Sequence, residues 1–436
     1  MNSSAHLSVR FVNSDFLSRS VASASRPFYL LLLKPWFLFL VALTAMLFRP
    51  PDVPFYSVDR IAFAMLIFFG LLRALLLRQS LRVTSPLTWP MAGLLGLALY
   101  DVLSQPFEAE AWSVLAAKWA VPFVLFHIAG LVFDNSDSLR RLEIFSLLVL
   151  AYLIAMALLF LCGAKAWIVP AFIVDDSIGI HADRARGPFL QAVANGVTLN
   201  LLGLIALDAF RRRHLPWLLG LTFLISLPLA ILATKTRGVW LSFAASVLIL
   251  MCFSLDVRVR RACLCLVLAG SLGLAMACSL REREASFTDR LQERSPVEFR
   301  MAVYQAGWEM FLQKPLSGWG FDGMQSELTR RISQFHQREY YFHNTFLEIL
   351  VQFGLPGLML YLWLVMQLFR LSRKRANASP NGSFLDENFR SLWPVLLLVY
   401  LLNASFVVMN YQFVNGWLFT LAGILAAQNR RAELNA

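Results

Sequence analysis

The sequence predicts an all-α integral membrane protein with about twelve transmembrane helices and a long helical loop on the outer side of the membrane. Three observations support this fold class. Of the 436 residues, 58% are hydrophobic and only 15% are charged. The apolar residues fall into runs of about 17 to 25, the length of helix that crosses a bilayer. The basic residues are distributed unevenly between the loops on the two sides of these runs.

Apolar segments suited to one membrane-spanning helix each recur along the whole chain. They begin near residues 28, 60, 86, 114, 143, 192, 217, 238, 262, 344, 391 and 413. The first of them follows a polar stretch that ends at Pro27, and no cleavage site of small residues is evident there. We therefore expect an uncleaved first span rather than a signal peptide.

The basic residues predict the orientation of these spans. Cytoplasmic loops of membrane proteins hold an excess of Lys and Arg, so we expect both termini inside. The arginine clusters on that side would be those within residues 10–26, 73–82, 140–141, 211–213, 258–261, 370–390 and 430–431. The same bias explains the formal net charge of +12, and we expect no nucleic-acid partner.

Spans and loops divide the chain into three parts. Residues 1–280 would form transmembrane helices 1–9 with short loops and one longer outer loop near 163–191. Residues 281–342 would form a periplasmic helical loop. Residues 343–436 would supply helices 10–12 and a cytoplasmic C-terminus.

The long outer loop contains a segment with helical periodicity and a glycine-rich segment. Apolar side chains recur at helical spacing, which predicts an amphipathic helix lying on the outer face of the membrane. They are Met301, Tyr304, Trp308, Phe311 and Leu312. The later pattern Gly318-x-Gly320-x-x-Gly323 formally matches a dinucleotide fingerprint, but that fingerprint requires a βαβ unit. We expect a tight turn there instead, which would place Trp319 against a lipid or a sugar.

Four basic residues in outer loops oppose the inside-positive trend. Lys235 and Arg237 lie in a turn between two predicted spans, and Arg184 and Arg186 precede Gly187 in the other long loop. Anchoring of long side chains at lipid headgroups would explain them. They also suit an anion clamp, because guanidinium groups bind diphosphate oxygens well in a partly dehydrated pocket. Two such pairs are a more specific signal than either alone.

His343 marks the point where the long outer loop re-enters the membrane. An imidazole at that boundary is suited to remove the proton of a sugar hydroxyl, since its pKa lies near neutrality. A histidine that only caps or packs the next helix is the alternative. Asn344 and Glu348 follow on neighbouring positions of one helix face and favour the catalytic interpretation.

The outer segments offer no convincing metal site. Glu108 and Glu110 form a Glu-x-Glu pair expected outside, and the chain contains no Asp-x-Asp motif. We therefore expect a reaction that uses neither a metal ion nor another cofactor.

These features occur in one order along the chain. The pieces are Arg184-x-x-Gly187-x-Phe189, Thr236-Arg237-Gly238, Arg300 with Trp308, Pro315-x-x-Gly318-Trp319-Gly320, and His343-Asn344-x-x-Leu347-Glu348 with Gly354 and Gly357. In this order and sidedness the chain resembles the O-antigen ligase and polymerase superfamily of bacterial inner-membrane glycosyltransferases. One departure is that the family often has a Pro-Asn pair shortly after the Phe that matches Phe189, where this chain has Gln191-Ala-Val-Ala-Asn195.

The resemblance implies an inverting, metal-independent glycosyltransferase of lipopolysaccharide biosynthesis. The donor would be O-antigen polysaccharide on undecaprenyl diphosphate, and the acceptor would be a lipid A–core sugar hydroxyl at the periplasmic face of the inner membrane. His343, Arg237 and Arg184 would be catalytic. The expected substrate-binding residues are Arg186, Lys235, Arg300, Asn344, Glu348 and Trp319.

Several alternatives stay open. An O-antigen polymerase or an O-linked protein oligosaccharyltransferase of the same superfamily would use the same donor and the same cations. A lipid-linked-sugar flippase belongs to a different class, and it should show related halves and charges near the membrane midplane. The sequence shows neither of these features, and it names neither the repeat unit nor the acceptor sugar.

Overall fold

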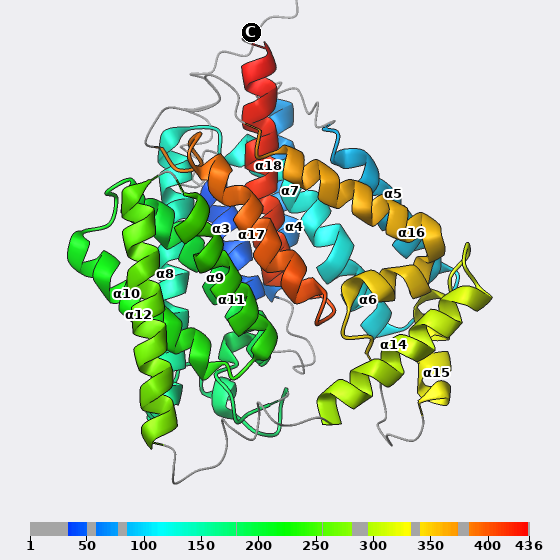
Figure 1. The fold of residues 1–436 in the computed structure, drawn as a ribbon. Helices are drawn as coiled ribbons and strands as arrows, with labels where there is room; N and C mark the ends of the chain where they lie inside the picture. Colours follow the sequence, from blue (N-terminus) through cyan, green and yellow to red (C-terminus); the bar gives the residue numbers. More distant parts are fainter. Residues whose placement is uncertain are drawn as a thin grey trace, which may run out of the picture.

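The computed structural model describes residues 34–49, 58–76, 85–179, 181–254, 256–280, 295–332, 341–373 and 383–434. Within these ranges the chain consists of helices joined by loops and turns, without a β-strand (Figure 1). The all-α fold class is therefore confirmed for the part of the chain that is described.

A helix of the structure corresponds to each predicted apolar segment. These helices are α3 (Pro35–Leu47), α4 (Val58–Leu76), α5 (Thr88–Leu103), α6 (Ala109–Leu115) continued through a π-helical turn (Ala116–Ala120) into α7 (Val121–Val132), α8 (Ser136–Leu161), α9 (Ala192–Arg211), α10 (Trp217–Ala233), α11 (Arg237–Phe253), α12 (Val257–Leu280), α16 (Thr345–Arg370), α17 (Phe389–Ala404) and α18 (Gln412–Leu434). Short 3-10 turns at Lys165–Trp167, Ala171–Val174 and Gly187–Phe189 shape the loop between α8 and α9.

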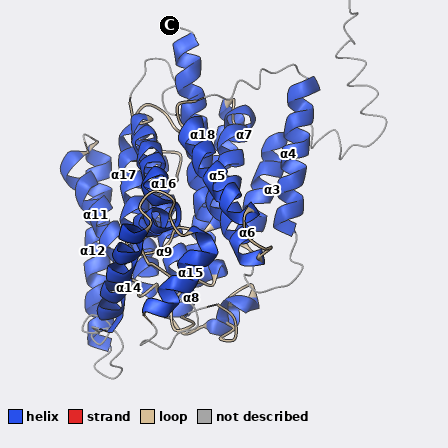
Figure 2. Cartoon of the chain, turned by 90° about the vertical axis from the view of Figure 1, so that its right-hand side faces the viewer, coloured by secondary structure: helices blue, strands red, loops and turns tan. Residues whose placement is uncertain are grey.

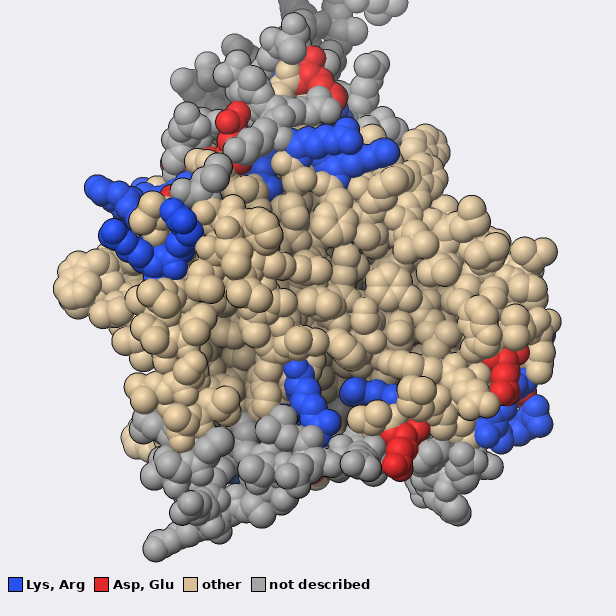
Figure 3. All heavy atoms as spheres, in the orientation of Figure 1, with Lys and Arg blue, Asp and Glu red and all other residues tan. Residues whose placement is uncertain are grey.

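Four segments of the described chain are long and apolar enough to cross a membrane. They are Ala109–Val132, Ser136–Leu161, Ala192–Arg211 and Thr345–Arg370, and five shorter apolar helices accompany them. The face drawn in Figure 3 agrees with a membrane protein, since charged groups of both signs lie at each end of the molecule and an uncharged belt lies between them. The total of twelve spans stays a prediction.

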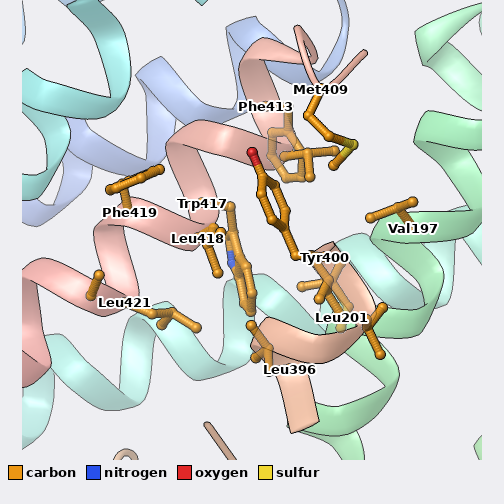
Figure 4. Close-up of a cluster of buried hydrophobic side chains, with 14 of the residues drawn as sticks. Val197, Leu201, Leu396, Tyr400, Met409, Phe413, Trp417, Leu418, Phe419 and Leu421 are labelled. Atoms are coloured by element: carbon orange, nitrogen blue, oxygen red, sulfur yellow. The ribbon is translucent and has the colours of Figure 1, made fainter. Parts of the chain in front are cut away.

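Helices from both halves of the chain pack against one another in the centre of the bundle. α18 packs along α7, and α17 packs between α9 and α11 (Figures 1 and 2). Apolar side chains of α9, α17 and α18 interlock there, among them Val197, Leu201, Leu396, Tyr400 and Trp417 (Figure 4). The polar tips inside this core are satisfied: Tyr400 donates to Asn415 at 2.8 Å, and Trp417 donates to Ser146 at 3.3 Å.

A buried ion-pair network holds the end of the bundle where the cytoplasmic arginines were predicted. Arg211 donates to Asp208 at 2.7 Å and to Asp386 at 3.0 Å. Arg212 pairs with Asp208 at 2.8 Å and with Glu143 of α8. The network joins α8, α9 and the segment before α17, and buried charges of this kind persist only when they are paired.

The described part of the long outer loop contains two helices, α14 (Ser295–Gln313) and α15 (Gly320–Arg331). α14 covers the predicted amphipathic segment, which confirms its helical character. The expectation of a tight turn over the glycines was wrong for Gly323, because this residue lies within α15. The turn ends at Gly320, where the amide of Phe321 donates to Asp101 at 2.9 Å and so begins α15 on the end of α5.

The turn between α14 and α15 docks into a kink of α16. Gly354 has φ 67° and interrupts the helix, which frees carbonyl and amide groups for other partners. Trp319 N donates to Val351 O at 2.9 Å, and Leu355 N donates to Pro315 O at 2.8 Å. Gly318 has φ 66°, and a Cβ at this position would lie 2.1 Å from the carbonyl oxygen of Gln352. Only glycine fits this close approach of two backbones.

We expect Gly318→Ala to destabilise the protein by roughly 2–4 kcal/mol, because a left-handed backbone and a backbone clash would act together. Gly323→Ala is the matched control, since its Cβ would meet the nearest atom, Trp319 Cβ, at 3.8 Å. Thermal unfolding of detergent-purified protein should show a clear loss for the first variant and almost none for the second. Equal melting temperatures for native protein and Gly318→Ala would contradict the packing described.

Candidate functional site

His343 lies in the turn that leads from the long outer loop into α16. Its φ of 51° turns the chain sharply, and Asn344 then caps α16 by accepting hydrogen bonds from the amides of Phe346 and Leu347 at 3.0 and 3.1 Å. Thr345 is fixed in turn, since its hydroxyl donates to Val407 O at 2.9 Å and accepts from Met409 N at 3.0 Å. The imidazole therefore sits on a backbone that is held at the start of α16.

The surroundings of His343 are apolar and positively charged. The ring of Phe299 meets the imidazole edge-on, with 6.0 Å between centroids. Burial lowers the pKa of His343 from 6.5, and the nearby charges of Arg300 and His181 lower it further, to about 4. The imidazole is therefore neutral at pH 7, which is the form that accepts a proton.

Arg184 and the Lys235–Arg237 turn are brought together by the backbone. Ala185 N donates to Ala233 O at 3.1 Å, which fastens the end of one outer loop to the end of α10. The side chain of Asn195 secures the same loop, because its Nδ2 donates to Ala185 O at 2.8 Å. The backbone beside Arg184 is thus adjacent to the end of α10, two residues before Lys235, although the two segments lie about 50 positions apart in the sequence.

Arg237 is the first residue of α11 and is exposed. The hydroxyl of Thr236 donates to Thr234 O at 2.9 Å and makes no capping hydrogen bond to α11. The first amides of α11 and the positive end of its dipole thus lie at the backbone of the residue that carries this guanidinium. Both contributions favour an anion at this position.

A contact chain links this clamp to His343. Gly238 packs beside the ring of Phe406, with 3.4 Å from its built Cβ position to the ring. The hydroxyl of Tyr304 lies 3.4 Å from Ser405 O and 3.3 Å from His343 O. Ser405 and Phe406, neighbours in the segment after α17, thus connect the start of α11 with the turn of His343. Basic side chains gather near the lower border of the apolar belt, under α11 and beside the start of α14 (Figure 3).

A buried polar network fixes the helices behind the clamp. Ser242 of α11 accepts from Asn403 of α17 at 2.8 Å and from Asn200 of α9 at 3.3 Å. These three side chains are all almost completely buried. Because a satisfied buried network resists displacement, α11 presents Arg237 from a fixed position.

Arg186 has a different place from the one predicted for a substrate ligand. Its side chain is 1% exposed, and its guanidinium donates to Ile173 O at 2.9 Å, to Ile178 O at 2.7 Å and to Asp175 O. It folds the 171–178 segment around itself. In this structure Arg186 shapes the outer loop that ends at Arg184, and any contact with substrate stays a prediction.

Glu348 and Trp319 are likewise engaged by the protein. Glu348 is buried one turn into α16 and forms an ion pair with Lys118 of the π-helical turn. Its carboxylate thus contacts Lys118. The role in orienting His343 or the acceptor, which the sequence suggested for Glu348, stays a prediction. Trp319 donates from Nε1 to Met310 O at 2.8 Å, and the ammonium of Lys314 lies 4.0 Å from its ring centroid.

Sequence reasoning missed three residues at this site. His181 is close enough to influence His343, Tyr304 joins α14 to the turn of His343, and Lys118 pairs with Glu348. Tyr304 was visible only as an apolar position of a helix, and His181 stands in a loop without a recognisable pattern. A buried lysine inside an apolar segment was the one signal available, since such residues are rare without a partner.

No group of three or more His, Cys, Asp or Glu side chains that could hold a metal ion occurs in the described ranges. The cations at this end are instead arginines and lysines.

Comparison with known proteins gives a partial match. Residues 221–362 match the family model described as O-antigen ligase. The matched segment contains Arg237, Arg300 and His343, whereas Arg184 lies outside it. No curated protein matches the chain significantly. The family model confirms the resemblance found from the sequence motifs, and this family implies a glycosyltransferase-type enzyme that acts on lipid-linked polysaccharide.

Proposed function

We propose that the protein transfers O-antigen polysaccharide from undecaprenyl diphosphate to a sugar hydroxyl of lipid A–core, with inversion at the anomeric carbon. The reaction would take place at the periplasmic face of the bacterial inner membrane. The observation that supports this proposal most directly is the partly buried His343, whose pKa is lowered by burial and by the nearby Arg300, at one end of a matched segment that also contains Arg237.

The charges that change during transfer suggest a role for each residue. The departing undecaprenyl diphosphate gains negative charge as the glycosidic bond breaks, and preorganised cations stabilise that charge. Arg237 and Arg184 are assigned to this task, with Lys235 in support. The attacking hydroxyl must lose its proton, and His343 is assigned as the base that accepts it. Burial, and after it the positive charge of Arg300, lowers the pKa of this imidazole and so favours its neutral form in the free enzyme.

A deletion strain distinguishes the ligase from the polymerase. Loss of long glycan on lipopolysaccharide, together with full-length glycan accumulating on the carrier lipid, is the result expected for a ligase. Single repeats on the core would instead show a polymerase, because that enzyme joins one lipid-linked repeat to another. Unchanged lipopolysaccharide with loss of glycan from a secreted protein would show the O-linked protein oligosaccharyltransferase.

We expect transfer to need no divalent cation. The chain has no Asp-x-Asp motif, and the outer end supplies cations from its own side chains. Purified protein should retain its rate in EDTA, since arginine and lysine replace the metal as diphosphate ligands. A large loss that magnesium or manganese restores would contradict this and would indicate a metal-bridged diphosphate.

A further inference from the structure

A cavity lies at the opposite end of the molecule from His343. It is bounded by the segment before α5, by α7, by the end of α16 and by the end of α18, and it encloses about 1250 Å³ including its open mouth. Nothing in the proposed transfer reaction uses this cavity, because the reacting groups lie at the outer end of the bundle.

The cavity has one charged side. Arg370, Arg373, Arg430 and Arg431 line it, and among the described residues of its lining Glu433 is the one acidic side chain. Figure 3 shows basic side chains gathered over the end of α16 beside α18, at the upper border of the uncharged belt. Arg431 is fixed at the rim, since its guanidinium donates to Asp134 O at 3.0 Å and to Gly130 O at 3.1 Å.

The opposite side of the cavity is apolar. Leu87, Phe126 and Leu131 line it. His127 is engaged by the protein there: its Nδ1 lies 2.7 Å from Phe123 O, and its Nε2 lies 3.1 Å from the Thr88 hydroxyl. A ligand that fits must therefore combine a negative headgroup with an apolar body.

Packing around the cavity is tight enough to keep its shape. α7 and α18 approach so closely that a Cβ on Gly423 would lie 2.1 Å from Phe126 O. Behind the wall, Arg390 is completely buried and donates to Leu371 O at 3.0 Å and to Asn429 at 2.6 Å. The helix ends that present the four arginines are thus held by the protein itself.

We propose that this cavity binds an anionic phospholipid of the cytoplasmic leaflet, with its phosphate held by Arg370, Arg373 and Arg430 and its acyl chains along Leu87, Phe126 and Leu131. Arginine clusters at the cytoplasmic border of membrane helices attract anionic headgroups, and the border position matches the depth of a lipid phosphate. An apolar pocket wall distinguishes this ligand from a free phosphate ion.

The test uses the full-length protein reconstituted in vesicles of phosphatidylglycerol, or of phosphatidylcholine, and then released for native mass spectrometry. We expect retained lipid from the first vesicles and almost none from the second. The triple variant Arg370→Gln, Arg373→Gln and Arg430→Gln should bind phosphatidylglycerol about 100-fold more weakly, since each such arginine contributes roughly a factor of five. The single exposed-site variant Arg373→Glu carries little risk to folding and should also release the lipid.

The matched control replaces Arg258, Arg260 and Arg261 by Gln, because this cluster lies at the same end of the molecule on another helix. Its lipid retention should equal that of the native protein. Equal losses in both triple variants would overturn the proposal in favour of a nonspecific charge effect. Displacement of the lipid by excess inorganic phosphate would also overturn it, and would indicate a site for the free ion.

Discussion

His343→Gln is expected to slow glycan transfer about 10²- to 10⁴-fold, the usual effect of removing a positioned general base. Glutamine keeps a hydrogen-bonding side chain but offers no basic nitrogen. Because residue 343 has a φ of 51°, His343→Asn is a useful second variant, since asparagine tolerates this backbone well. Single-turnover transfer with purified protein and lipid-linked donor measures the effect.

Binding of the donor must be followed separately in these variants. Donor affinity and thermal stability should stay near native values, because the contacts that hold the turn come from Asn344 and Thr345. His214→Gln, at the other end of the molecule, serves as the histidine control and should transfer normally. Near-native turnover of His343→Gln or His343→Asn would end the assignment of His343 as the base.

The pH dependence should differ between the free enzyme and its donor complex. The rate requires neutral His343, so kcat/KM should fall as the pH drops through the pKa of about 4 in the free enzyme. Bound diphosphate brings negative charge that favours the imidazolium, so the acid limb of kcat should lie at higher pH. Arg300→Gln should raise the acid limb of kcat/KM, because it removes a charge that lowers the pKa of His343. An acid limb of kcat/KM near pH 6.5 in the native protein would contradict the burial of this residue.

Arg237→Ala is expected to lose roughly 2–4 kcal/mol of transition-state stabilisation, or about two to three decades in rate. Its guanidinium stands at the start of α11, where the helix dipole adds to its own charge. Arg237→Lys should recover only part of the rate, because an ammonium lacks the planar fork that binds two diphosphate oxygens. The measurement is transfer at saturating donor together with donor affinity.

A matched surface cation separates this effect from general electrostatics. Lys165 lies in the other outer loop and packs its ammonium 5.5 Å from the ring of Phe160. Lys165→Gln removes the same charge and should leave the rate within about twofold, as expected for an exposed charge that is screened by salt. Normal transfer and normal donor binding by Arg237→Ala would place the clamp elsewhere.

The sequence by itself determined the helical fold class, the position of the apolar segments and the residue types available for the chemistry. These features depend on local properties: a run of apolar residues is helical in a bilayer because its backbone groups must be satisfied within the segment. The motifs from Thr236 to Gly357 were recognisable for the same reason, since each is short and contiguous. Sidedness likewise depends only on counting basic residues, and it stays a prediction.

Only the tertiary structure decided which of these residues meet and what each is free to do. Lys118 and Glu348 are 230 positions apart in the chain and form a buried pair that no spacing rule indicates. Arg186 and Arg184 look alike in the sequence, yet three loop carbonyls engage the guanidinium of Arg186. The low pKa of His343 likewise arises from burial and from Arg300, because desolvation depends on neighbours that folding alone brings together.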